Sequence, residues 1–219
     1  MTLVEDLLIA VLPTFILLMV IKQHDMNEKE PTGLLVKLFI MGMLSVIPAI
    51  ILESMVYLPT YTYFQVFMYA FIGVALIEES VKLFMAKIAL KRATSFDEVY
   101  DGIIYCVYVS LGFATVENVM YVLQFGTSTG IVRAVTAVPA HAVFAISMGY
   151  FMGLVKSGRG GPVGRFLIWF APTLLHAVYD FILFTNLDWS LIVFIPYIAW
   201  IYSKAIDMIR ETYDMEPFE

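Results

Sequence analysis

Long apolar segments separated by short polar ones dominate the pattern of this chain. Each segment is close to the roughly 20 residues that an α-helix needs to cross the hydrocarbon core of a bilayer. The breaks between them carry loop-forming residues, as in the glycine-rich stretch from Ser157 to Gly164. The pattern therefore predicts about seven membrane-spanning helices, at residues 3–21, 34–57, 64–86, 100–124, 131–155, 165–184 and 190–206.

Composition supports a membrane protein. The chain is 61% hydrophobic and only 15% charged, whereas a soluble domain carries roughly 25% charged residues. The apolar segments use nearly all of the 219 residues, so we expect an all-α, polytopic fold with a single transmembrane domain over residues 1–219. No basic patch suggests a nucleic-acid partner, and the single cysteine, Cys106, excludes an internal disulfide framework.

The positions of the basic residues predict an orientation. If seven helices alternate in direction, only Arg133 lies at the end of the bundle that holds the N-terminus. Because basic residues in short loops stay in the cytoplasm, we expect the N-terminus outside and the C-terminus in the cytoplasm. The basic residues at the other end are Lys22, Lys29, Lys37, Lys87, Lys91, Arg92, Lys156, Arg159, Arg165, Lys204 and Arg210.

Several ionisable or strongly polar residues fall inside the predicted helices, where a charge costs several kcal/mol. Each has a structural explanation: an ion pair within one helix, a hydrogen bond between helices, or an ordinary buried histidine. Four helices contribute such residues, however, and this convergence indicates a functional site. They are Glu78, Glu79 and Lys82 on the third helix, Glu117 and Asn118 on the fourth, His141 on the fifth, and His176 and Asp180 on the sixth.

The depth of these residues sharpens the prediction. At 1.5 Å per residue, Glu78, Glu117, His141 and His176 all lie roughly 10–20 Å from the outer ends of their helices. Asp180 lies nearer the outer face. The candidate site is therefore expected in one layer of the outer half of the membrane, open to water from outside.

The chemistry of this set suits hydrolysis of an amide without a covalent intermediate. Of two adjacent carboxylates, one can hold a proton while the other accepts one. Histidine and asparagine can donate hydrogen bonds to the oxyanion that forms when water attacks a carbonyl. The chain has no G-x-S-x-G nucleophile turn and no H-E-x-x-H zinc helix. Cys106 is expected near the cytoplasmic face, far from the histidines.

Two other functions remain open at this stage. His141, His176 and a glutamate could hold a catalytic zinc ion, which would make the chain a metalloprotease. Buried carboxylates also serve proton-coupled transporters and ion-binding membrane sensors. The sequence has no visible inverted repeat or pair of broken helices to favour a transporter.

The motifs resemble those of a known family. Glu78-Glu79-x-x-Lys82, Phe113-x-x-x-Glu117-Asn118, His141 and His176-x-x-x-Asp180 occur in the order found in the PrsW family. That family lies within the superfamily of CAAX-prenyl proteases and bacteriocin-processing enzymes. The resemblance extends from the first loop to the sixth predicted helix. One E-E-x-x-K motif is common, but four ordered blocks are specific.

The resemblance implies an intramembrane protease of the glutamic type in a bacterial cell membrane. Its expected substrate is a single-pass, membrane-spanning anti-sigma factor, which it cuts first, on the extracytoplasmic side. A second protease then releases the sigma factor for an envelope-stress response. The lipid bilayer is the only other expected partner. No cofactor is expected, with zinc as the alternative.

The resemblance also implies roles for the residues. Glu78 would be the base that activates water, with Glu79 assisting or orienting it, and His176 would stabilise the oxyanion. The pocket would be completed by Glu117, Asn118, His141 and Asp180. The wider superfamily often has histidine where Glu117 stands, which leaves the role of Glu117 open and makes His141 a candidate to replace that imidazole.

Overall fold

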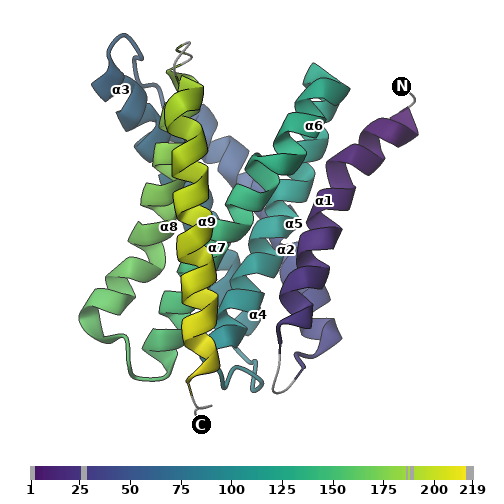
Figure 1. Cartoon of the computed structure of the whole chain (residues 1–219), viewed down its shortest axis with the longest axis vertical. Coiled ribbons are helices and arrows are strands. Elements are labelled where there is room, and N and C mark those ends of the chain that lie inside the picture. Colours follow the sequence, from purple (N-terminus) through teal and green to yellow (C-terminus); the bar gives the residue numbers. More distant parts are fainter. Residues whose placement is uncertain (1–2, 26–28, 186, 188–189, 216–219) are drawn as a thin grey trace.

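The computed structural model describes residues 3–25, 29–185, 187 and 190–215, and all of its regular structure is helical. The helices form one upright bundle with the N-terminus at one end and the C-terminus at the other (Figure 1). In chain order they are α1 (Leu3–Gln23), α2 (Thr32–Ser54), α3 (Tyr63–Met68), the π-helix η1 (Tyr69–Ala75), α4 (Leu76–Leu90), α5 (Val99–Phe125), α6 (Thr127–Val135), α7 (Ala137–Lys156), α8 (Gly161–Phe184) and α9 (Ser190–Tyr213).

Within these residues, six helical segments are long and apolar enough to cross a membrane. They correspond to six of the seven predicted spans. The lipid-facing surface is apolar, as shown by exposed side chains such as Leu12, Ile47 and Ile195. The chain is therefore a multi-pass membrane protein, and the all-α prediction is confirmed.

The remaining predicted span, at 64–86, has a different build. Here α3, η1 and α4 follow one another without a break from Tyr63 to Leu90. A capping box begins this continuous helical segment. Thr62 accepts a hydrogen bond from the Gln65 N–H, and the Gln65 side chain accepts one from the Thr62 N–H. The π-helix ends just before the charged turn that contains Glu78, and such wide turns occur frequently at functional sites.

The span predicted at 131–155 matches the candidate span Thr127–Lys156, but the structure divides it into α6 and α7 at Thr136. The reason is Pro139 in the first turn of α7. Proline has no N–H to donate to the carbonyl four residues earlier, so an uninterrupted helix through this point is unfavourable. The break lets α6 approach α1 and α5 before α7 continues through the bundle.

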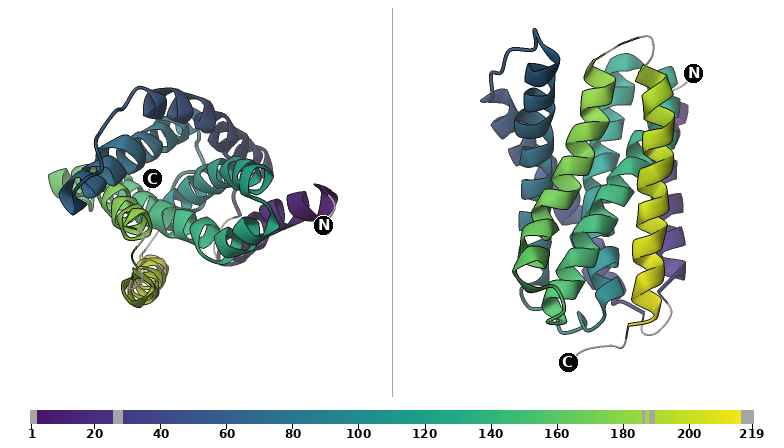
Figure 2. Two further views of the ribbon diagram at one scale, coloured as in Figure 1. Left: turned by 90° about the horizontal axis from the view of Figure 1, so that it is seen from above. Right: turned by 60° about the vertical axis from the view of Figure 1, so that its left-hand side comes forward.

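α5 is the most buried of the candidate spans and α9 the least, and α9 stands at the rim of the bundle when it is viewed along its long axis (Figure 2). Small residues let α5 pack closely. A Cβ atom added at Gly149 of α7 would lie 2.2 Å from the Gly102 carbonyl oxygen of α5. One added at Gly112 would lie 2.2 Å from the Phe39 carbonyl oxygen of α2. Such backbone contacts are typical of membrane helices.

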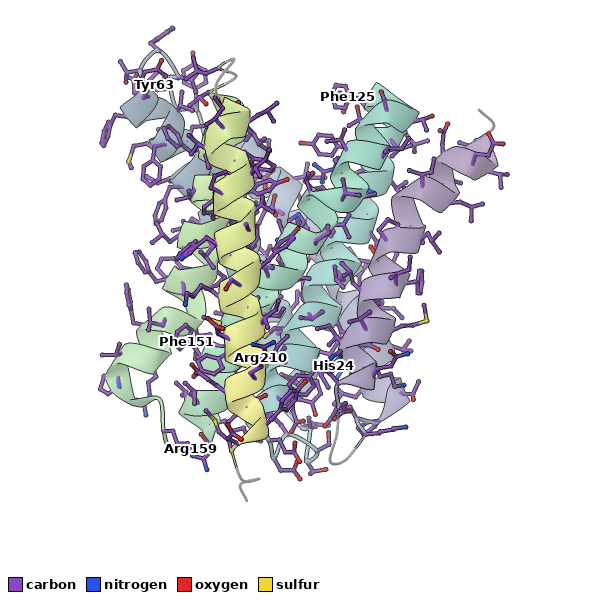
Figure 3. The ribbon with its side chains drawn as sticks, in the orientation of Figure 1. His24, Tyr63, Phe125, Phe151, Arg159 and Arg210 are labelled. Atoms are coloured by element: carbon purple, nitrogen blue, oxygen red, sulfur yellow. The ribbon has the colours of Figure 1, made fainter. Side chains whose placement is uncertain are left out.

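The two basic residues labelled in Figure 3 lie at the C-terminal end of the bundle, as the alternating pattern predicted. Arg159 and Arg210 are in the lower part of Figure 3, whereas Tyr63 and Phe125 are at the top. Asp101 and Cys106 belong to the first turns of α5 at that lower end, and Cys106 is buried and unpaired by disulfide. Both are remote along α5 from Glu117.

Candidate active site

The first turns of α4 build a charged cluster around the ammonium group of Lys82. Its Nζ lies 2.9 Å from Glu78 Oε2 and 2.8 Å from Glu79 Oε1. Helical spacing alone places these carboxylates on the same face as the lysine, four and three residues earlier. All three side chains are buried, and Glu79 is fully so. The cost of burying these charges is offset by their pairing.

His141 of α7 connects this cluster to Glu117 of α5. Its Nε2 lies 2.9 Å from Glu117 Oε2 and its Nδ1 lies 3.3 Å from Lys82 Nζ. An ammonium group can only donate a hydrogen bond and a carboxylate can only accept one. The partners therefore assign the proton of a neutral His141 to Nε2 and leave the Nδ1 lone pair to accept from Lys82.

His176 of α8 lies on the other side of the glutamates. Its Nδ1 is 3.0 Å from Glu79 Oε1 and 4.0 Å from Glu78 Oε2. Its Nε2 is 3.4 Å from Asp180 Oδ2, an ion-pair distance without hydrogen-bond geometry. The ring stacks on Phe144, with centroids 4.9 Å apart, which fixes its orientation. Carboxylates beside both nitrogens mean that His176 can act as a donor at either one.

These groups border a cavity of about 620 Å³, which is large enough for a short peptide segment. The cavity opens between α2, η1, α4, α5, α6, α7 and α8. Glu78 lines it, but Glu79 and Lys82 lie behind the wall. The other ionisable residues of the lining are Glu53, Tyr69, Glu117, Tyr121, Arg133, His141, His176, Tyr179 and Asp180.

The structure brings together most of the residues singled out from the sequence. Glu78, Glu79, Glu117, His141, His176 and Asp180 form one connected set. Asn118 is the exception. Its amide donates to the Ala10 carbonyl oxygen at 2.8 Å, and its Oδ1 accepts from Arg133 Nε at 3.1 Å. Asn118 does not belong to the cavity lining and reaches the cluster only through Arg133.

Sequence reasoning missed two acidic or basic residues of this cavity, Arg133 and Glu53. Arg133 of α6 forms an ion pair with Glu117 at 2.8 Å. The sequence contained a signal for this role, because Arg133 was the one basic residue predicted at the N-terminal end of the bundle. Glu53 lies in the last turn of α2, where the helix dipole disfavours an anion. Its Oε1 is buried without a hydrogen-bond partner among the described residues.

The chemistry of the cluster also invites a test for a metal ion. Glu78, Glu79, His141 and His176 each offer one ligand atom, and these atoms lie within 4.8 Å of one another. Two carboxylates and two imidazoles are ligand types that zinc accepts. The Lys82 ammonium, however, makes hydrogen bonds with three of these four groups. The arrangement does not fit a divalent ion while Lys82 stays in this position.

Comparison with known proteins identifies the family. The family described as "PrsW family intramembrane metalloprotease" matches residues 30–201. The chain is 33% identical to Protease PrsW of Clostridioides difficile over 213 residues, covering 93% of this chain and 90% of that protein. It is 37% identical to Protease PrsW of Oceanobacillus iheyensis over 155 residues (70% and 72%) and 31% identical to that of Bacillus subtilis over 180 residues (80% and 82%).

No solved structure matches the chain. The match to the family and the coverage of its curated relatives favour a protease over a transporter or an ion-binding sensor. The chain belongs to the PrsW family and is an intramembrane protease.

Proposed function

We propose that this protease makes the first cut in a single-pass, membrane-spanning anti-sigma factor, on the extracytoplasmic side, by a glutamic mechanism. The support for the substrate class is the sequence resemblance. The support for the side of the cut is that the cavity lining includes Phe125, which lies at the end of the bundle opposite Arg159 and Arg210 (Figure 3). Since basic loops remain in the cytoplasm, the cavity lies in the outer half of the membrane.

The observation that carries the mechanism is the different position of the two adjacent glutamates. Glu78 lines the cavity, whereas Glu79 is fully buried behind it and bonded to Lys82 and His176. A general base must reach the water that attacks the substrate. Glu78 is therefore the base, and Glu79 is a positioning residue that holds Lys82 and His176 in place.

The reaction follows from this assignment. Glu78 takes a proton from water while the water oxygen bonds to the scissile carbonyl carbon. The carbonyl electrons move to oxygen, and an N–H of His176, which lines the same cavity, donates to that oxyanion. The C–N bond then breaks as the proton on Glu78 passes to the departing nitrogen. The products are a carboxyl end and an amino end.

The remaining polar residues orient this centre. Arg133 neutralises Glu117, and Glu117 in turn holds the Nε2 proton of His141. His141 then accepts from Lys82, so that this chain of contacts keeps the ammonium close to both glutamates. Asn118 holds Arg133 against α1 through the Ala10 carbonyl. Asp180 stands beside Nε2 of His176.

The test is co-expression with membrane-spanning anti-sigma factors of the same genome, followed by mass mapping of the fragments. We expect one anti-sigma factor to be cut at its extracytoplasmic side, leaving a membrane-bound fragment with the cytoplasmic domain intact. The Glu78→Gln variant is the control and should form the fragment at least about 10²-fold more slowly. A cut on the cytoplasmic side would overturn the orientation, and fragments only from other classes of membrane protein would overturn the substrate class.

A further inference from the structure

The Lys82 ammonium is held as a cation at the centre of the cluster. An ammonium has three N–H donors. Among the described residues, three acceptors stand at hydrogen-bond distance from Nζ: Glu79 Oε1 at 2.8 Å, Glu78 Oε2 at 2.9 Å and His141 Nδ1 at 3.3 Å. All three donors are therefore used. The ring of Phe113 lies against the same ammonium, with its centroid 4.2 Å from Nζ.

This position coincides with that of a hypothetical metal ion. Three of the four groups that could bind a metal are the same groups that bind Lys82. Zinc ligands lie about 2.0–2.2 Å from the ion and each must offer it a lone pair. Here the distances to Nζ, 2.8–3.3 Å, are those of hydrogen bonds, and the lone pairs already accept protons.

The Lys82 side chain cannot easily move away to admit a metal ion. Only 1% of the residue is exposed, and it does not line the cavity into which it would have to move. If it left, Glu78 and Glu79 would lose their counter-ion in a buried site, and an uncompensated buried charge is strongly unfavourable. If it stayed, a divalent cation would lie within a few ångströms of an ammonium group.

We propose that Lys82 is the built-in cation of this site. It occupies the place of a metal ion, neutralises the paired glutamates and keeps the four potential ligands free of metal. It follows that removal of the ammonium converts the same cluster into a metal site of the zinc type, with Glu78, Glu79, His141 and His176 as ligands. The inference does not depend on the identity of the substrate.

The experiment is a titration of the purified, detergent-solubilised protein with Co²⁺, whose visible absorption reports ligand number and geometry. The parent should show no cobalt spectrum and no change in thermal unfolding. Lys82→Ala should bind about one Co²⁺ per chain with a tetrahedral spectrum. It should also unfold at a higher temperature when the metal is present, because a ligand that binds only the folded state stabilises it.

Three further variants separate the explanations. Lys82→Arg retains a cation and should show no cobalt spectrum. The matched control Lys37→Ala removes a lysine that donates to the Ala89 carbonyl oxygen and not to the cluster. It should also show no cobalt spectrum. The double variant Lys82→Ala, His176→Ala should lose most of the affinity gained by Lys82→Ala, because a ligand is missing.

Stoichiometric metal in the parent, or a cobalt spectrum with Lys82 intact, would overturn the inference. So would a folded Lys82→Ala protein that binds no more Co²⁺ than the parent. If Lys82→Ala does not fold, Lys82→Gln removes the charge but keeps a polar side chain that is one atom shorter, and this variant must then bind Co²⁺. Substrate cleavage is not part of these measurements, so a negative result leaves the protease assignment standing, and a failure to cut anti-sigma factors leaves this inference intact.

Discussion

Two regions of the bundle bury carboxylates, and they satisfy them in different ways. At the cavity, Glu78 and Glu79 are paired with the charged Lys82. At the opposite end, Glu30 of the α1–α2 loop accepts hydrogen bonds from the hydroxyl groups of Ser95 and Tyr105. Both regions are buried, and among the described residues Glu78 lines the 620 Å³ cavity whereas Glu30 does not.

The second region, which we call the Glu30 network, contains Glu30, Ser95, Tyr105 and Asp101. Asp101 accepts the backbone N–H groups of Asp97 and Glu98 at the start of α5, at 3.0 and 2.6 Å. These donors are neutral and come from the loop and helix ends that the network ties together. Such an arrangement fixes the α1–α2 loop and the α4–α5 loop to α5.

The difference teaches how a buried acid in a membrane protein can be interpreted. A carboxylate satisfied by hydroxyl and backbone donors, and absent from the lining of the main cavity, is a structural element. A carboxylate held by a buried cation, with one face on a cavity, keeps a lone pair for chemistry. Glu78 fits the second description and Glu30 the first, although both are glutamates with 5% exposure.

The largest expected effect is on the cleavage rate, and it comes from a change at the cavity. Glu78→Gln should lower the cleavage rate by about 10²–10⁴-fold, because an amide of similar size cannot accept the proton from water. Thermal unfolding in detergent should change much less. The variant is assayed as purified protein on a mapped substrate.

Glu53→Gln is the informative comparison for Glu78. Glu53 lines the same cavity but contacts no cation among the described residues. Its loss of rate should be much smaller than that of Glu78→Gln. Equal losses in the two variants would mean that the cavity needs negative charge in general and not a base at Glu78.

The next effect is on stability. Tyr105→Phe removes a hydroxyl donor from buried Glu30 and should cost about 1–3 kcal/mol of unfolding free energy, the penalty for an acceptor left without its partner. The cleavage rate per folded molecule should be unchanged. Tyr61→Phe is the matched control, since Tyr61 is 89% exposed and its change should be neutral. A Tyr105→Phe protein that folds normally but cleaves slowly would remove the distinction between the regions.

The smallest expected effect is a pH dependence of the Glu30 network. Burial raises the pKa of Glu30 above its ordinary value, against the hydrogen bonds of Tyr105 and Ser95, which lower it. The folded state therefore binds this proton more tightly than the unfolded state. Stability is highest below the ordinary pKa of a glutamate and falls as the pH rises through the raised pKa of the folded state.

The measurement is the unfolding temperature of the parent and of Glu30→Gln between about pH 4 and pH 8. The parent should lose stability across this range, and the variant should show a shallower slope. Some slope should remain, because burial also raises the pKa of Asp25, whose carboxylate accepts the Glu30 N–H. Identical slopes in parent and variant would exclude Glu30 as the titrating group.

Much of this molecule was determined locally by its sequence. Hydrophobic runs of membrane length produce the helices because a lipid environment requires every backbone polar group to be satisfied within its own segment. The spacing of Glu78, Glu79 and Lys82 places them on one helix face whatever the rest of the chain does. The same holds for His176 and Asp180, one turn apart on α8.

The tertiary structure alone decided the contacts between helices. No local spacing links Arg133 to Glu117, Glu53 to the cavity, or Asn118 to the Ala10 carbonyl. These pairs depend on how closely the helices approach one another and on how far each is rotated about its axis. Small residues such as Gly112 and Gly149 allow a close approach, but their presence in the sequence does not specify which helices meet. For the same reason, the sequence could give the distance of Lys82 from its glutamates along α4, but not the arrival of His141 as the third acceptor that completes its surroundings.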